Sequence, residues 1–215
     1  MRIKWLGHAS FLITSDTGTK IITDPYLVGG GINYGEIKES ADIVTVSHEH
    51  GDHSNVAAIR GKPEVVKDLG TRKIKGIEVK GIPTYHDDAG GNRRGKNTMF
   101  SFEVDGIRVC HPGDLGHQLS DKQINEIGKI DILLIPVGGF FTIDAKVATD
   151  VTAKIKPKVI IPMHYKTDKC AYSIAEVNDF LKGKTGVSQL DTSETEFKKE
   201  RLPTITQIVV LKPAL

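Results

Sequence analysis

The seven residues Ser47-His48-Glu49-His50-Gly51-Asp52-His53, which we call the histidine loop, constrain this chain more than any other segment. They follow a strand predicted for residues 43–47, which is largely β-branched and typical of a buried strand. Alternate side chains of extended backbone point the same way, so the first two histidines face one position. Gly51 lets the chain turn, so that Asp52 and His53 face a second position. One loop can thus offer ligands to two metal ions roughly 3.5–4 Å apart, an arrangement that activates water.

Imidazole and carboxylate ligands of this kind suit zinc, manganese and iron. We expect two divalent metal ions, with zinc as the first choice and manganese or iron as alternatives. A solvated turn that happens to be rich in histidine is a poor explanation, because three of the eight histidines lie within six residues behind a core strand.

The composition is that of a globular protein. Of 215 residues, 39% are hydrophobic and 26% are charged, and we expect residues 1–215 to form a single domain. The formal net charge of +2 lacks the basic excess of a nucleic-acid-binding protein, so no nucleic acid is expected as a partner. No apolar run approaches the roughly 20 residues of a transmembrane helix, and the first residues read as a strand rather than a signal peptide. The two cysteines have no C-x-x-C spacing, and the expected location is the cytoplasm.

The hydrophobic pattern predicts short strands first and then an alternation of strands and helices. Strands are expected at residues 3–6, 10–14, 20–23, 43–47, 73–75, 77–82, 98–104, 107–110, 132–136, 159–162 and 205–211. Helices are expected at residues 56–60, 64–69, 121–127, 145–155 and 173–181, the last with a capping box of Ser173 and Glu176. Residues 191–200 are expected to be a solvated loop. Mixed sheets covered by helices satisfy this pattern, so the predicted fold class is an α/β layered sandwich.

The pattern His48-x-His50-x-Asp52-His53 matches the H-x-H-x-D-H signature of the metallo-β-lactamase superfamily, which the chain resembles over nearly its whole length. The resemblance implies a four-layer αββα sandwich with the site at one edge between the two sheets. It also implies three further ligands that follow downstream strands, namely His86 in Pro-Thr-Tyr-His-Asp, Asp114 in Pro-Gly-Asp-Leu-Gly and His164 in Ile-Pro-Met-His-Tyr.

The same resemblance divides the ligands between two metals. It places His48, His50 and His86 at the first metal, Asp52, His53 and His164 at the second, and Asp114 between both. The implied reaction is hydrolysis by a hydroxide held between the metals, whose charge lowers the pKa of the water and stabilises the developing oxyanion. Asp52 is expected to orient the hydroxide and accept its proton, Asp114 to space the metals, and His164 to contact the leaving group.

A finer resemblance is to the branch that contains ascorbate-6-phosphate lactonase and N-acyl-phosphatidylethanolamine phospholipase D. It is carried by Trp5-Leu6-Gly7-His8-Ala9-Ser10 and Thr23-Asp24-Pro25, and bacterial hydrolases of unassigned substrate are similar again at residues 141–144 and 162–165. In that branch the aspartate of T-D-P orients the ligand loop by hydrogen bonds, a role that falls here to Asp24. Residues 166–170 depart from the Gly-Thr-Phe that many relatives carry there, so no relative's substrate can be transferred.

Two substrate classes remain open, a phosphodiester and a lactone or other activated ester. The short chain favours a small soluble substrate. Basic residues near the site would favour a substrate that carries a negative charge. A different hypothesis is a non-catalytic metal-binding protein, whose structural or regulatory site would have a closed coordination shell. Redox chemistry at a di-iron centre is a third hypothesis. The sequence argues against it, because the chain lacks a flavodoxin-like segment and the extra carboxylate ligand of such relatives. Metal identity and oligomeric state are left open.

Several residues near the predicted ligands have two readings. His8 suits packing and function equally well, and a basic loop with Arg93, Arg94 and Lys96 either attracts a phosphate or carboxylate or is merely solvated. The remaining candidates are read first as structural: His111 and His117 as hydrogen-bonded histidines, and Phe140 and Phe141 as packed aromatic residues.

Overall fold

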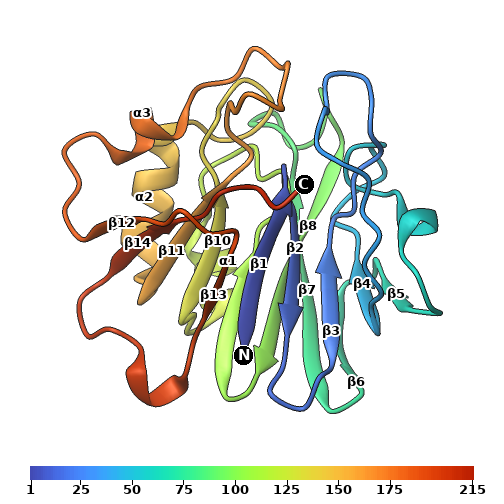
Figure 1. Ribbon diagram of the computed structural model, residues 1–215. Coiled ribbons are helices and arrows are strands. Elements are labelled where there is room, and N and C mark those ends of the chain that lie inside the picture. The colour runs from blue at the N-terminus through green and yellow to red at the C-terminus, as the bar shows by residue number, and fades with distance from the viewer.

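Two β-sheets pack face to face in the computed structural model, which describes residues 1–215 (Figure 1). The six-stranded sheet has the order β13-β1-β2-β3-β4-β5 and the eight-stranded sheet the order β12-β14-β11-β10-β9-β8-β7-β6. The first comprises β1 (Arg2–Gly7), β2 (Ser10–Thr14), β3 (Lys20–Thr23), β4 (Ile43–Thr45), β5 (Glu64–Val66) and β13 (Glu194–Glu196). The second comprises β6 (Gly70–Ile74), β7 (Ile77–Tyr85), β8 (Lys96–Val104), β9 (Ile107–His111), β10 (Ile132–Pro136), β11 (Val159–Met163), β12 (Val187–Gln189) and β14 (Gln207–Val210).

The central strands β2, β3 and β4 of the six-stranded sheet are buried on both faces, because successive side chains enter two different hydrophobic clusters. On β1 and β2, Ile3, Phe11 and Ile13 belong to the larger cluster of 42 buried residues, which reaches across to the second sheet. Leu12, the neighbour of Phe11, instead joins a second cluster of 13 buried residues on the outer face. This alternation fixes the register of the sheet, since a slip of one residue would exchange the two faces.

The outer layers of the sandwich differ. Helices α1 (Asp121–Ile127), α2 (Ala145–Ile155) and α3 (Val177–Leu181) pack on the eight-stranded sheet and place Ile127, Ala148 and Phe180 in the larger cluster (Figure 1). The outer face of the six-stranded sheet is covered mainly by loop residues 26–41 and by the 3₁₀ helix η1 (Val56–Ala58). A second 3₁₀ helix, η2 (Lys199–Arg201), precedes β14. The predicted α/β sandwich is confirmed, with one helical outer layer and one made chiefly of loop.

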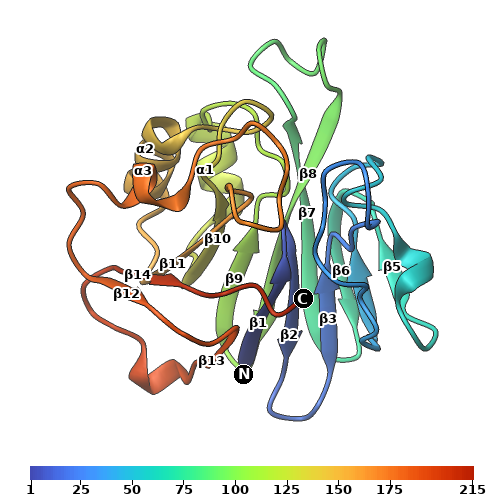
Figure 2. The same ribbon diagram turned by 45° about the horizontal axis from the view of Figure 1, so that its top comes forward.

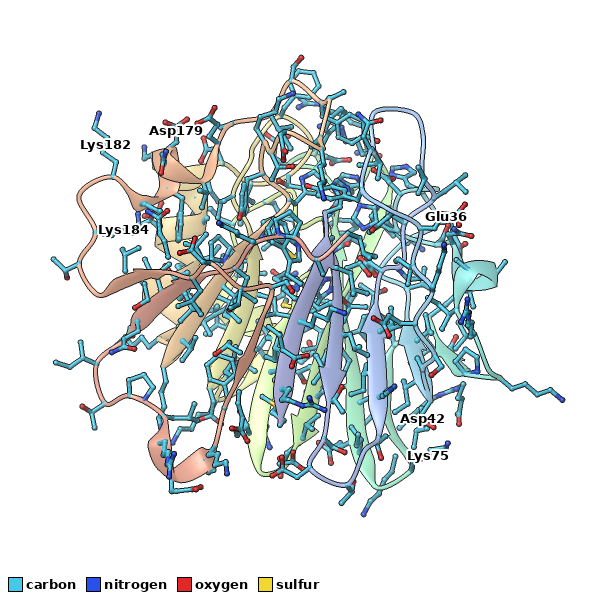
Figure 3. The ribbon with its side chains drawn as sticks, viewed as in Figure 1. Glu36, Asp42, Lys75, Asp179, Lys182 and Lys184 are labelled. Atoms are coloured by element: carbon cyan, nitrogen blue, oxygen red, sulfur yellow. The ribbon has the colours of Figure 1, made fainter.

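The loops that follow β3, β4, β7, β9 and β11 meet at one edge of the sandwich, at the top of Figure 1 and brought forward in Figure 2. They meet there because β3 and β4 run parallel in one sheet, as β9, β10 and β11 do in the other. At the opposite edge Lys75, from the β6–β7 turn, forms an ion pair with Asp42, which precedes β4 (Figure 3). All the predicted metal ligands follow strands that end at the first edge.

Three sequence predictions of local structure are wrong. Residues 64–66 form β5 rather than a helix, because β-branched Val65 and Val66 pair with β4 and tertiary pairing overrides weak local helix propensity. The predicted helix 173–181 begins only at Val177 and has no capping box, since Ala175 donates to the Gly138 carbonyl at 2.7 Å and holds the preceding chain extended. Within the predicted loop 191–200, residues 194–196 form β13 because they pair with the otherwise open edge of β1.

Several predicted strands have different bounds: those expected at 43–47, 77–82 and 98–104 are β4, β7 and β8, residues 43–45, 77–85 and 96–104. The strand expected at 73–75 is β6, residues 70–74, and the one expected at 205–211 is β14, residues 207–210. The helix expected at 56–60 is limited to the 3₁₀ turn η1. No helix of the structure is long and apolar enough to cross a membrane.

We expect Phe102→Ala to lower the free energy of unfolding by about 3–5 kcal/mol, because Phe102 is 1% exposed in the larger cluster and its loss leaves a cavity. Urea denaturation followed by circular dichroism measures this change. Leu69→Ala is the control, since Leu69 is 57% exposed and its truncation should alter the free energy by no more than about 0.5 kcal/mol. Equal effects of the two substitutions would contradict the assigned core.

Candidate metal centre

The histidine loop leaves the edge of the six-stranded sheet directly after β4 and enters the space between the sheets. His48 and His53 are buried, with 8% and 0% exposed, whereas His50 is exposed at the rim. The loop turns back on itself where the backbone N–H of His53 donates to the carbonyl of His50 at 2.9 Å. This turn directs the imidazoles of His50 and His53 to different positions, as the sequence predicted.

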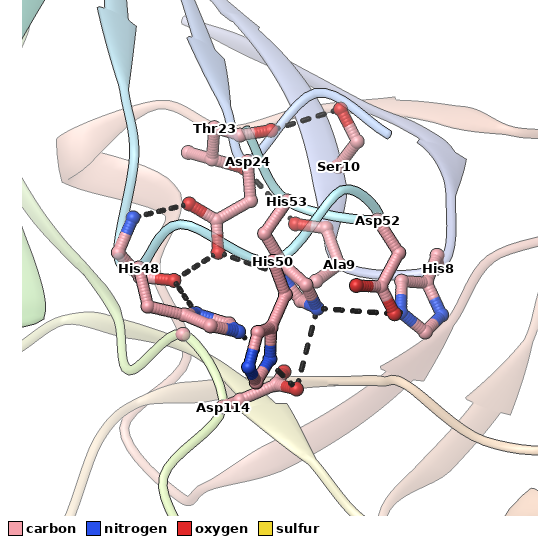
Figure 4. A network of polar contacts seen from close by, with 12 residues as sticks. His8, Ala9, Ser10, Thr23, Asp24, His48, His50, Asp52, His53 and Asp114 are labelled. Carbon is pink, nitrogen blue, oxygen red and sulfur yellow. Dashed lines mark hydrogen bonds and ion pairs between the residues drawn. The ribbon is translucent and has the colours of Figure 1, made fainter. Parts of the chain in front are cut away.

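The carboxylate of Asp114 lies at the centre of the buried cluster, opposite Asp24 across the histidine rings (Figure 4). Its Oδ2 atom is 3.2 Å from Nε2 of His53, 3.3 Å from Nε2 of both His86 and His164, and 4.0 Å from Nε2 of His48. Four imidazoles from three separate loops therefore converge on one carboxylate oxygen.

Two groups of three imidazoles bring their nitrogen atoms close enough together to hold a cation. The nitrogens of His48, His50 and His86 lie within 4.8 Å of one another, and so do those of His8, His53 and His164. Asp114 has close contacts with members of both groups. Asp52 lies beside the second group, with its Oδ2 atom 3.3 Å from Nε2 of His8 and 3.9 Å from Nε2 of His53. All seven predicted ligands are thus brought together, and His8 joins them.

Unpaired polar atoms show that this donor set fits metal ions. Six buried atoms of the cluster make no hydrogen bond with the protein, namely Nε2 of His8, His48 and His53, Nδ1 of His86 and His164, and Oδ1 of Asp114. A buried polar group without a partner costs roughly 1–3 kcal/mol, and such groups seldom gather unless they serve an ion or a reaction. Neutral imidazole nitrogen and carboxylate oxygen are common ligands of zinc, manganese and iron.

The electrostatics keep His8, His48 and Asp114 in the protonation states that metals require, whereas at His53 burial lowers the pKa but Asp114 and Asp24 outweigh it and raise the pKa above its ordinary value. Burial lowers the pKa of His48 to about 3 and, together with the neighbouring His164, that of His8 to about 4, so both imidazoles are neutral at pH 7. Burial alone would raise the pKa of the Asp114 carboxyl, but His164 and His53 hold it well below its ordinary value. Asp114 is therefore a carboxylate even though it is only 2% exposed.

Asp24, which directly follows β3, holds the histidine loop in place through contacts with Ser47 and His53 (Figure 4). Its Oδ1 atom accepts from the backbone N–H of Ser47 at 2.8 Å, and its Oδ2 atom accepts from the Ser47 hydroxyl and lies 3.0 Å from Nδ1 of His53. Because Nδ1 of His53 is engaged there, its Nε2 atom faces the cluster. The supporting role that the sequence resemblance implied for Asp24 agrees with this geometry.

Asp114 is positioned by a close packing of loops that only glycine permits. A Cβ atom on Gly113 would lie 2.4 Å from Cβ of Ser47 and 2.5 Å from Oδ1 of Asn97, and Gly113 has a φ of 57°. Asn97 also accepts the backbone N–H of Asp114 at 3.0 Å. The Pro-Gly-Asp sequence thus orients the carboxylate of Asp114. No pattern in the sequence indicated that Asn97 would support it.

The Trp5-Leu6-Gly7-His8 segment brings His8 to the site. The indole N–H of Trp5 donates to the His8 carbonyl at 3.0 Å, and the backbone N–H of His164 donates to the same carbonyl at 3.1 Å. His8, Asp24 and His164 all have positive φ, at 53°, 38° and 50°, a strained conformation that tends to gather at functional sites. Of its two sequence readings, His8 therefore fits the functional one.

A cavity of about 320 Å³ opens beside the cluster. It is lined by five of the predicted ligands together with Arg93, Arg94, Phe141 and Tyr172. Tyr172, which sequence reasoning missed, donates its hydroxyl proton to Oδ2 of Asp52 at 3.2 Å. Nothing in the local sequence marks it, because residues 165–176 reach the cavity only through the tertiary fold.

The other histidines contact the backbone, as expected. His111 is buried with its Nε2 atom 2.8 Å from the Ala9 carbonyl, and Nε2 of His117 accepts from the backbone N–H of Tyr85 at 3.1 Å. Lys96 borders a neighbouring hollow rather than the cavity.

Asp24→Asn should weaken metal binding by about 10- to 100-fold, because an amide cannot accept all the hydrogen bonds that orient Ser47 and His53. Competition with a chromophoric chelator measures the affinity. Asp179→Asn on α3, which removes the same charge from an exposed position far from the site (Figure 3), is the matched control and should bind metal like the wild type. Unchanged affinity in Asp24→Asn would show that the Asp24 contacts do not support the ligands.

Comparison with known proteins identifies the family. Residues 2–164 match the model of the beta-lactamase superfamily domain. The chain is 35% identical to a metal-dependent hydrolase of Carboxydothermus hydrogenoformans and 33% identical to one of Archaeoglobus fulgidus. These alignments cover 78% of this chain in both cases, and 85% and 84% of the two relatives.

A solved structure from Thermotoga maritima is similar over almost the full length. That protein, described as a candidate zinc-dependent hydrolase of the metallo-β-lactamase superfamily, is 38% identical, with a TM-score of 0.82 over 98% of this chain and 97% of its own. Family model, relatives and structure agree with the ligand geometry. The chain therefore belongs to the metallo-β-lactamase superfamily, and within it to a family of metal-dependent hydrolases.

Proposed function

We propose that this protein hydrolyses a phosphodiester, lactone or other activated ester of a small molecule at a centre of two divalent metal ions, with zinc as the first choice. The observation that carries the proposal is the position of Asp114 Oδ2, within 4.0 Å of four imidazole nitrogens that belong to two ligand groups. A carboxylate so placed suits two cations better than one.

Under this proposal the ligands divide as the sequence indicated. His48, His50 and His86 would hold one ion, Asp52, His53 and His164 would hold the other, and Asp114 would serve both. His8 lies against the second group and against Asp52, so it either supplements that group or contacts what binds there. Bound ions of this kind supply activation of water and neutralise the charge that develops in the transition state.

The residues of the chain then orient the reactants. Asp52 receives a hydrogen bond from Tyr172 and lies beside His8, so its carboxylate keeps one orientation at the cavity wall. Burial alone would raise the pKa of Asp52, but His8 and the neighbouring His53 hold it below its ordinary value, so Asp52 is a carboxylate at neutral pH. His164, from the opposite sheet, also lines the cavity, and we expect it to contact the leaving group.

The cavity supports a small substrate and a catalytic site. A volume of about 320 Å³ is at the lower end of small-molecule pockets. His50 is exposed and lines this cavity, so the ligand groups are open to solvent on one side. A structural metal site would have a closed shell, which makes the non-catalytic alternative the weaker one.

Metal analysis and activity on one sample test the proposal. We expect two metal equivalents per chain and turnover of either bis-p-nitrophenyl phosphate or a panel of lactones that a chelator abolishes and added zinc or manganese restores. Elemental analysis and initial rates give both quantities. One tightly held metal without turnover on any substrate would overturn the two-metal proposal in favour of the structural or regulatory site.

Asp52→Asn should lower kcat by at least about 100-fold while the chain stays folded, since the amide neither accepts a proton nor holds a cation equally well. Glu49→Gln is the matched control, because Glu49 belongs to the same loop but is exposed and paired with Lys67 at 2.8 Å. Near-wild-type activity of Asp52→Asn, or an equal loss in both variants, would remove Asp52 from the reaction.

A further inference from the structure

One cation at the cavity has no protein partner. The side chain of Arg94 lines the cavity and is partly buried, and its guanidinium has neither a carboxylate within 4.0 Å nor a hydrogen-bond acceptor in the protein. The adjacent Arg93 is exposed and forms an ion pair with Asp88 at 2.9 Å. Of these two consecutive arginines, only Arg94 therefore has all the N–H donors of its guanidinium free to bind a ligand.

Aromatic side chains hold the Arg94 guanidinium in place. Its Cζ atom lies 5.3 Å from the ring centroid of Phe141 and 5.8 Å from that of Phe140. Phe140 is 67% exposed and has a φ of 60°, an uncommon and costly arrangement for an aromatic residue. Contact with aromatic rings uses none of the guanidinium N–H groups as hydrogen-bond donors to a protein acceptor, so these donors are free to meet a ligand.

The backbone that carries Arg94 is fixed by a buried carboxylate. Asp87, which is 3% exposed, accepts the backbone N–H groups of Ala89 and Gly91 through Oδ1 and those of Arg93 and Arg94 through Oδ2, at 2.7 to 3.0 Å. Asp87 directly follows the predicted ligand His86. The loop between β7 and β8, which stands out from the sheet in Figure 2, is thus anchored to the same segment as the metal centre.

Arg94 also separates the cavity from a second hollow of about 460 Å³. That hollow is also lined by His50, by Lys96, and by Lys67 with its ion-pair partner Glu49. Because the charges of Lys67 and Glu49 offset each other, Arg94 and Lys96 leave a net positive charge beside the exposed His50, which favours the approach of anions.

We propose that Arg94 binds an anionic group of the substrate, a carboxylate or a phosphate that is not itself the reacting group, through its free guanidinium edge. This inference rests on the proposed hydrolytic function and names the substrate class as an ester with an anionic group near the bond that is cleaved. Asp87 acts as a positioning residue for the arginine, and Phe141 as its platform. A planar guanidinium pairs with either anion through two parallel hydrogen bonds.

Two esters with the same leaving group test the proposal. Mono-p-nitrophenyl succinate ends in a carboxylate, whereas p-nitrophenyl butyrate of similar length ends in a methyl group. The wild type should have the higher kcat/KM for the succinate ester. Arg94→Gln should lower that value by about 10- to 100-fold, the effect of a lost charge-assisted hydrogen bond, and leave the butyrate ester nearly unchanged. Arg94→Lys should give an intermediate loss, because lysine keeps the charge but not the planar fork.

Binding measurements separate the two anions and need no turnover. Phenylphosphonate and benzoate, which share a ring and differ in the anionic group, are titrated calorimetrically into the metal-loaded protein. In Arg94→Gln the Kd of at least one should rise by about 10- to 100-fold, and the one that rises more identifies the group. If the wild type hydrolyses neither these esters nor bis-p-nitrophenyl phosphate nor any lactone of the panel, but Arg94→Gln still weakens binding, the inference stands and the proposed function fails.

Two further arginine variants control for a general effect of charge. Arg108→Gln on β9 removes an equal charge from a surface pair with Glu103 and should match the wild type in all assays. Arg93→Gln should have a smaller effect than Arg94→Gln. Equal losses in the two loop variants, an equal effect of Arg94→Gln on both esters, or unchanged Kd values for both anions would overturn the proposal.

Discussion

The carboxylate of Asp114, buried among four imidazoles, is the constraint around which the rest of the molecule is arranged. A buried charge without compensation is costly, and a group of buried imidazoles without partners is costly too. The carboxylate and the imidazoles reduce this cost for each other, because the negative charge of Asp114 lies close to the imidazole nitrogens. The nitrogens that remain without a hydrogen bond are suitable ligands for divalent cations. The buried polar groups of the site therefore lower the stability of the folded chain locally, and in return they form a set of ligands that is already in place before a metal binds.

Holding such a set requires rigid supports from many directions. Ligands and supports come from the ends of strands in both sheets, so the large apolar cluster between the sheets fixes the distances between loops. Asp24 fixes the histidine loop from the six-stranded sheet, and Asn97 on β8 fixes Asp114 from the eight-stranded sheet. The strained backbones of His8, Asp24 and His164 persist because this surrounding structure determines their positions.

The same arrangement gives the cavity two unlike walls. One consists of the ligands, and the other of Phe141, Tyr172 and the arginine loop, which the sandwich scaffold does not itself require. Loops vary more freely than the strands that carry them, so a shared ligand set can serve different substrates. Under the proposed function, the choice of substrate therefore depends on loop residues outside the histidine loop, such as Arg94, Phe141 and Tyr172.

The sequence by itself determined the layered α/β class, the superfamily and the seven residues that meet at the site. It could do so because the ligand spacing in the histidine loop is local, and because the resemblance to the superfamily implied the three ligands that follow downstream strands. Only the tertiary structure decided that His8 and Tyr172 join the site, that residues 194–196 pair with β1, and that Arg94 rather than Arg93 is left without a partner. These outcomes depend on contacts between segments far apart in the chain, whose energies exceed any local preference and leave no periodic trace in the sequence.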